Sequence, residues 1–173
     1  MLQRTIQLYA NSFAGLSRDI WLLSFITLVN RSGTMVLPFL TVYMTAGLDF
    51  TLTQAGMVMG FFGGGSMLGA WIGGKLTDRF GFYGVMFGSL VFGGAGFIGL
   101  IFVQSFWELC IAVFILSSIA DTFRPAVFAA IAAYSKPENL TRSSTLLRLA
   151  INLGFSVGPA VGGVLAATVG YSA

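Results

Sequence analysis

The sequence predicts an all-α membrane protein, a polytopic bundle of five spanning helices with a cytoplasmic N-terminus. Hydrophobic residues make up 56% of the 173-residue chain and charged residues only 9%, whereas about 25% of an average soluble domain is charged. The apolar residues form continuous runs of roughly the 20 residues that cross a bilayer, and lysine and arginine fall between alternate runs. Long runs without alternation favour helices over the strands of a membrane barrel.

Residues 1–18 are predicted to form an amphipathic helix that lies along the inner membrane surface. Its apolar residues recur at spacings of four and three, which places them on one helix face. Polar residues lie between them, so the segment is too polar to insert. The apolar stripe consists of Leu2, Ile6, Tyr9, Phe13 and Leu16. Ser17 is expected to cap the first spanning helix.

Residues 19–173 are predicted to form the transmembrane helix bundle. Short loops separate its five apolar runs, which are residues 20–44, 50–74, 80–107, 109–134 and 149–170. The last helix is expected to begin earlier than its apolar run, near Thr141.

The basic residues orient this bundle. Loops 75–80 and 135–142 and the N-terminal segment carry lysine or arginine, whereas loops 45–51 and 104–108 carry none. Because cytoplasmic loops are enriched in these residues, we expect the N-terminus in the cytoplasm and the end of the fifth span outside. The residues concerned are Arg4, Arg18, Lys75, Arg79, Lys136 and Arg142.

Composition excludes several functions. The chain contains no histidine, which removes a Ser-His-Asp triad and an imidazole metal site. No nucleophile–base pair or metal cluster can be assembled, so we expect no enzyme, and no nucleotide-binding segment of the Gly-x-x-x-x-Gly-Lys-Ser/Thr type occurs, so we expect no cofactor. The net charge of +3 is scattered, which argues against nucleic acid as a partner. Cys110, the single cysteine, is expected to be a buried hydrophobe.

Four charged side chains fall inside the predicted spans, where each costs a few kcal/mol. Three of the spans also carry polar residues at helical spacing, which predicts that the first, fourth and fifth spans line a wet cavity. The candidate substrate or proton pathway is Arg31, Thr34, Ser117, Asp121, Arg124, Arg148 and Asn152. Alternatively, Asp121 and Arg124 form an internal ion pair that only fixes helix packing.

Glycine recurs every fourth residue in three spans, a pattern that lets helix backbones approach closely. The rows begin at Gly60, Gly65, Gly84 and Gly154. In the fifth span, this row lies on the opposite face from the polar residues.

Two segments resemble the major facilitator superfamily. The stretch Gly74-Lys-Leu-Thr-Asp78-Arg79-Phe-Gly81 is similar to that family's Gly-x-x-x-Asp-Arg-x-Gly-Arg-Lys loop, although Phe82 and Tyr83 replace its two final basic residues. The fifth span resembles the family's Gly-x-x-x-Gly-Pro-x-x-Gly-Gly motif, best known from drug/proton antiporters, through Gly154, Gly158, Pro159, Gly162 and Gly163.

The resemblance implies five helices of a six-helix N-terminal half. It also implies that Gly74, Asp78, Arg79 and Gly81 form a gating loop that latches the two halves of a carrier at the cytoplasmic side. The residues themselves leave two simpler interpretations open: a loop with a role in topology only, and a glycine–proline row that only packs and kinks its helix. Gly74 and Gly81 would permit tight turning.

The expected function is secondary active transport of a small solute by alternating access, as proton-coupled efflux across a bacterial inner (plasma) membrane. One alternative is an uptake symporter for an anionic nutrient, because three arginines and one aspartate in the spans sum to +2. Another is a transport-inactive piece of a longer carrier, because no sixth helix follows the fifth. The expected partners are a small-molecule substrate, the lipid bilayer and the missing C-terminal half.

Overall fold

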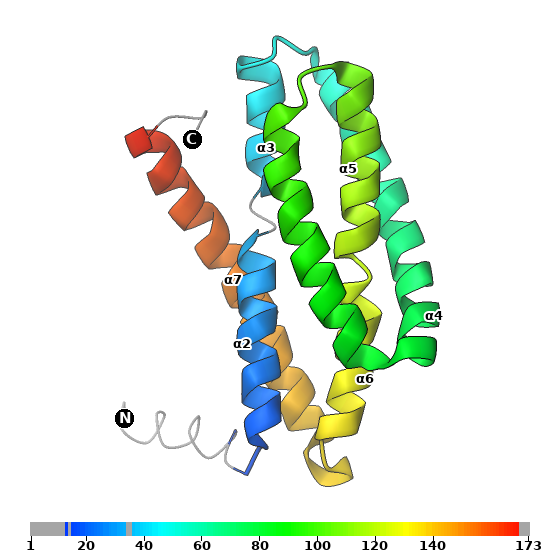
Figure 1. Cartoon of the computed structure of the whole chain (residues 1–173). Helices are drawn as coiled ribbons and strands as arrows, with labels where there is room; N and C mark the ends of the chain where they lie inside the picture. Colours follow the sequence, from blue (N-terminus) through cyan, green and yellow to red (C-terminus); the bar gives the residue numbers. More distant parts are fainter. Residues whose placement is uncertain (1–12, 14, 34–35, 170–173) are drawn as a thin grey trace. The chain divides into compact units, whose positions relative to one another are not determined.

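The computed structural model describes residues 13, 15–33 and 36–169. In this part of the chain it is all-helical, without a strand (Figure 1). The helices are α2 (Arg18–Ser32), α3 (Val36–Ala46), α4 (Leu52–Gly99), α5 (Phe106–Ala120), α6 (Phe123–Tyr134) and α7 (Leu140–Val169), with 3-10 turns at Leu100–Phe102 and Pro137–Asn139. The predicted all-α class is confirmed for these residues. Most of the predicted surface helix (residues 1–12 and 14), Thr34 and residues 170–173 lie outside the described part.

The chain divides into two compact units. One consists of Met1–Val36 and Ala130–Ala173, and the other of Leu37–Ala129. The boundaries fall within α3 and α6.

In the second unit, α4 is two helical limbs joined at Gly81. The helix begins with a capping box in which Thr51 Oγ1 accepts from the Gln54 backbone N–H (3.2 Å) and Gln54 Oε1 accepts from the Thr51 N–H (2.9 Å). Gly81, with φ 77° and ψ 158°, is the non-helical residue inside α4, and this left-handed region favours glycine. The chain turns back there, so the two limbs run in opposite directions (Figure 1). The prediction of a loop over 75–80 is therefore wrong, because the first limb stays helical as far as Phe80.

The predicted fourth span is also interrupted, between α5 and α6. Pro125 has no N–H to donate, and in a continuous helix its ring would clash with the carbonyl four residues earlier, that of Asp121. The Arg124 N–H instead bonds to that carbonyl from three residues away (3.3 Å), and Asp121 and Thr122 form a turn. Directly before the turn, the Ala120 carbonyl accepts a hydrogen bond from Ser89 Oγ on the second limb of α4 (3.1 Å).

In the first unit, α2 and α7 lie side by side and run in the same direction (Figure 1). At the start of both helices, Ser17 Oγ donates to the Tyr134 carbonyl (3.2 Å) and Asn139 Nδ2 donates to the Gly15 carbonyl (3.4 Å). Further along, Gly154 of α7 lies against Leu28 and Arg31 of α2. Ser17 caps α2, as expected, by accepting from the Ile20 N–H (3.4 Å).

Three helical segments of the described chain are long and apolar enough to cross a membrane. They are Leu52–Phe102 (51 residues), Phe106–Tyr134 (29 residues) and Pro137–Val164 (28 residues). The first contains the Gly81 turn and thus holds two limbs. α2 and α3, with 15 and 11 residues, are each shorter than a span of roughly 20, and residues 34–35 between them lie outside the description, so the first span stays a prediction.

Candidate functional site

A row of three buried glycines in the first limb of α4 packs against α5 and the start of α6. A Cβ at Gly65 would overlap Ser117 Oγ and the Phe114 carbonyl oxygen, and one at Gly69 would overlap the Ser118 carbonyl oxygen. A Cβ at Gly73 would lie 2.6 Å from the Thr122 Cα and 2.9 Å from Pro125 Cγ. The absence of side chains therefore lets the two backbones meet directly. Successive glycines meet successive turns, so this limb and α5 run parallel.

The close approach joins a serine to the charged residue at the helix break. Ser66 Oγ donates a hydrogen bond to Asp121 Oδ2. Ser66 follows Gly65 directly and precedes Gly69 by three residues, so it lies at the edge of the glycine row. Asp121 is the C-cap of α5 and is half-buried. Ser66 is not among the predicted pathway residues, because it lies in an uncharged apolar run. Its place within the glycine row was the available signal.

Three neighbouring hydroxyls donate to carbonyls only three or four residues earlier in the chain. Ser117 Oγ and Ser118 Oγ both donate to the Phe114 carbonyl (3.1 and 2.8 Å), and Thr122 Oγ1 donates to the Ile119 carbonyl (2.7 Å). Such bonds meet the polar requirement of an apolar interior without recruiting a neighbouring helix. The Asp121 carboxylate, by contrast, takes its hydroxyl partner from another helix.

The break separates residues predicted to share one polar face of the fourth span. Ser117 is 1% exposed and lies in the α4–α5 contact, whereas Arg124 is exposed on α6. Among the described residues, no ion pair joins Asp121 to Arg124. The expectation that these polar residues follow the spacing of one continuous helix is therefore corrected, because the helix is interrupted at Asp121 and Thr122. The alternative interpretation, an Asp121–Arg124 ion pair that fixes helix packing, is likewise not found among the described residues.

In the first unit, Arg31 and the fifth-span motif meet at the α2–α7 contact. A Cβ at Gly154 would lie 2.8 Å from the Arg31 Cβ and 2.8 Å from the Leu28 carbonyl oxygen. Arg31 is half-buried, whereas Arg148 and Asn152 of α7 are exposed. The motif residues Gly154, Gly158 and Gly162 are buried, and Pro159 and Gly163 are exposed.

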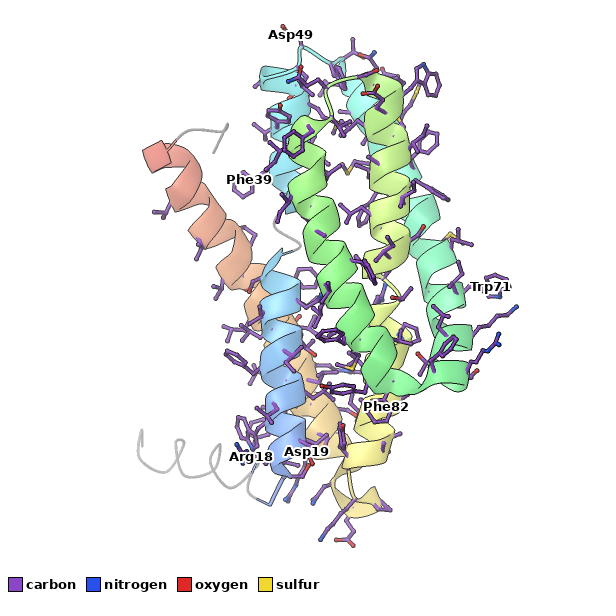
Figure 2. The ribbon with its side chains drawn as sticks, in the orientation of Figure 1. Arg18, Asp19, Phe39, Asp49, Trp71 and Phe82 are labelled. Carbon is purple, nitrogen blue, oxygen red and sulfur yellow. The ribbon has the colours of Figure 1, made fainter. Side chains whose placement is uncertain are left out.

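The segment predicted as a gating loop forms the last turns of the first α4 limb. Gly74 is helical with open space around it, so the turn depends on Gly81 alone. Asp78 and Arg79 are exposed next to that turn, with the Arg79 guanidinium 5.4 Å from the centre of the Phe80 ring. Lys75 Nζ lies 3.8 Å from the centre of the Trp71 ring, and Trp71 points outward from α4 (Figure 2). No cluster of three or more metal-ligating residues occurs in the described chain.

Comparison with known proteins identifies the family. The sequence profile of the Major Facilitator Superfamily matches residues 20–173. The chain is 27% identical over 139 residues to a protein named multi-drug resistance efflux pump PmrA homolog from Lactococcus lactis, covering 79% of this chain and 34% of that protein. It is 31% identical over 140 residues to the uncharacterized MFS-type transporter YttB of Bacillus subtilis, covering 80% and 35%.

A third relative is the enterobactin exporter EntS of Shigella flexneri, 28% identical over 160 residues, which cover 90% of this chain and 38% of EntS. The chain thus spans little more than a third of the length of these relatives. The profile match extends over nearly the whole chain. The described residues form long apolar helices, as the resemblance of the two motifs implies. The chain therefore belongs to the major facilitator superfamily, a family of membrane transporters and not of enzymes.

Proposed function

We propose that this chain is part of a secondary active carrier that exports a small solute across a bacterial inner membrane in exchange for protons. The observation that carries the proposal is the Asp121 carboxylate, held at a helix break inside an apolar bundle by a serine of a neighbouring helix. The names of two relatives, an efflux pump homolog and an enterobactin exporter, support the outward direction.

A topology with five crossings is part of the proposal. α2 and α7 run in the same direction, which requires an odd number of crossings between them. The two limbs of α4 and the α5–α6 pair supply three. The bundle would then be multi-pass, with the predicted span over residues 20–44 as its first crossing.

The charges at the ends of the second unit support a cytoplasmic N-terminus. The rings of Phe50 and Phe106 meet at a centroid distance of 5.8 Å, so loops 45–51 and 104–108 lie at one end, which carries no lysine or arginine. Figure 2 shows Asp49 and Phe82 at opposite ends of this unit. The Gly81 end carries Lys75 and Arg79, which supports a cytoplasmic position for it under the positive-inside rule.

The chemistry of a carboxyl group in this position supports the proposed proton coupling. When ionised, the Asp121 carboxylate can only accept hydrogen bonds, whereas a protonated carboxyl also has an O–H to donate. Because a charge inside the bilayer costs a few kcal/mol, taking up a proton would remove that cost and change what the helix break can bind.

We include in the substrate or proton pathway the other predicted residues, Arg31, Thr34, Ser117, Arg124, Arg148 and Asn152.

The turn of α4 would act as a cytoplasmic latch. Asp78 and Arg79 are exposed there and can reach a partner, and the relatives have about two thirds of their length beyond the matched region. We propose that the remaining part of the carrier supplies that partner and completes the transport pathway.

The test is Asp121→Asn in the complete carrier, reconstituted in liposomes with the fluorescent cation ethidium as trial substrate. We expect proton-driven uptake to be lost while exchange of labelled for unlabelled ethidium continues. The matched control is Glu108→Gln, which changes an exposed acid at the other end of α5. Normal proton-driven flux in Asp121→Asn would refute the role. If the variant fails to fold, Asp121→Asn with Arg124→Gln should restore the protein if the acid is only a structural counter-charge.

The direction of transport separates the proposed exporter from the alternative anion symporter. In inverted vesicles, an exporter accumulates substrate when the interior is acidic. A symporter for an anion would instead carry a carboxylate probe such as lactate, together with a proton, into right-side-out vesicles. The three arginines predicted within the spans are the observation in favour of that alternative.

A further inference from the structure

We propose that Ser66 is the positioning residue for Asp121, holding the ionised carboxylate against α4 and releasing it when the carboxyl takes up a proton. The proposal rests on the proposed proton-coupled function and assigns a role in it to a residue of a second helix, α4. Protonation of Asp121 would thereby be linked to the contact between α4 and α5.

The glycine row gives Ser66 its reach. Gly65 and Gly69, on either side of Ser66, meet the backbone of α5 with no side chain between. A serine side chain is short, so its hydroxyl can bond across two helices only when their backbones approach this closely. The hydrogen bond from Ser66 to Asp121 is therefore a consequence of the packing on both sides of it.

The chemistry of the two groups makes the contact sensitive to protonation. An ionised carboxylate can only accept, and the serine hydroxyl has one proton to donate. A bond to a charged acceptor is about twice as strong as a neutral one. Once Asp121 is protonated, its own O–H can donate elsewhere, and the hold of Ser66 on it weakens.

Few other charges are placed to compete for Asp121. The stretches 52–74 and 82–99 of α4 contain no Asp, Glu, Lys or Arg. On α5, Glu108 lies near the opposite end, and Arg124 of α6 makes no ion pair with Asp121 in the described structure. The other titratable residues of α4 and α5 lie away from Asp121 along the chain: Lys75, Asp78, Arg79 and Tyr83 are near the Gly81 turn, and Cys110 is in the first turns of α5.

The helix break gives Asp121 the freedom that such a switch needs. Asp121 lies after the last helical residue of α5, in a turn that Pro125 imposes. The preceding residue is anchored separately, since Ser89 bonds to the Ala120 carbonyl (3.1 Å). Loss of the Ser66 bond can therefore move the carboxyl without releasing α5.

The first test is infrared difference spectroscopy of the complete carrier between acidic and alkaline buffer. The carboxyl band that disappears in Asp121→Asn belongs to Asp121. We expect that band to shift in Ser66→Ala and to return in Ser66→Thr, which keeps the hydroxyl. Ser118→Ala is the matched control, because the Ser118 hydroxyl bonds within its own helix (2.8 Å). An unshifted band in Ser66→Ala would overturn the proposal.

The second test measures transport of ethidium in liposomes for the same variants. Ser66→Ala should lower proton-driven flux by about tenfold, the effect of losing a hydrogen bond to a charged group, and leave ethidium exchange unchanged. Ser66→Thr should recover flux, and Ser118→Ala should match the parent. A shifted infrared band with unaltered coupled flux would show a structural contact only and would overturn the positioning role. A parent carrier without proton-driven flux would refute the proposed function, whereas the infrared band would still report on the Ser66–Asp121 bond.

Discussion

Adding one methyl group at Gly69 should destabilise the protein, whereas adding it at Gly60 of the same helix limb should not. A Cβ at Gly69 would lie 2.9 Å from the Ser118 Cα and carbonyl carbon and would overlap the carbonyl oxygen. All three are backbone atoms, so no side-chain rotation can relieve the overlap. A Cβ at Gly60 would meet nothing within 4 Å.

The magnitude follows from two opposing effects. Replacing glycine by alanine inside a helix gains about 0.5–1 kcal/mol, because the unfolded chain loses freedom. Overpacking a close contact costs about 1–3 kcal/mol. We therefore expect Gly60→Ala to be neutral or stabilising. The free energy of unfolding of Gly69→Ala should be about 2 kcal/mol lower than that of Gly60→Ala, equivalent to about 4–8 °C in melting temperature for a chain of this length.

Cys110 provides the assay. It is the single cysteine of this chain, is fully buried and lies on α5, which packs against Gly69. A thiol-reactive fluorophore will label it only as the helix contact opens, so the labelling midpoint during heating in detergent reports the melting temperature of this region. If Gly69→Ala melts at or above the temperature of Gly60→Ala, the backbone contact between α4 and α5 is wrong.

Three further predictions concern the turn and the topology. Gly81→Ala should destabilise the folded protein by about 1 kcal/mol or more, because alanine is strained at the φ of 77°. Gly74→Ala should leave stability unchanged, because a Cβ there meets open space, and thermal melting in detergent compares the two variants. Asp78→Asn should lower transport by the complete carrier at normal expression through loss of a charged latch, and unchanged flux would favour a topology role alone. In a Cys110→Ser background, Asp49→Cys should react with an impermeant maleimide from outside the cell, and reaction only from the cytoplasmic side would reverse the proposed topology.

Much of the architecture follows from local properties of the sequence. Apolar runs of spanning length predicted the long helices. A segment that crosses a membrane must be apolar over roughly 20 consecutive residues and must satisfy its own backbone hydrogen bonds, so both requirements involve residues that are close in the chain. The Ser17 cap likewise depends on neighbours a few residues away. Pro125 was a local signal for the break after Ala120 that the hydropathy pattern obscured, and Lys75–Phe80 was read as a loop because charge, not helix geometry, marked it.

The contacts that define the candidate site depend on tertiary structure. Glycine occurs every fourth residue both at Gly60 and Gly64 and along the row from Gly65 to Gly73, and periodicity alone gives these rows equal weight. In the structure, a Cβ has open space at Gly60 but meets the backbone of α5 at Gly69. Ser66 and Asp121 are 55 residues apart in the chain, so no local pattern relates them. They meet because the chain reverses at Gly81 and again before α5, which brings the first limb of α4 alongside the end of α5 with only glycine between the backbones.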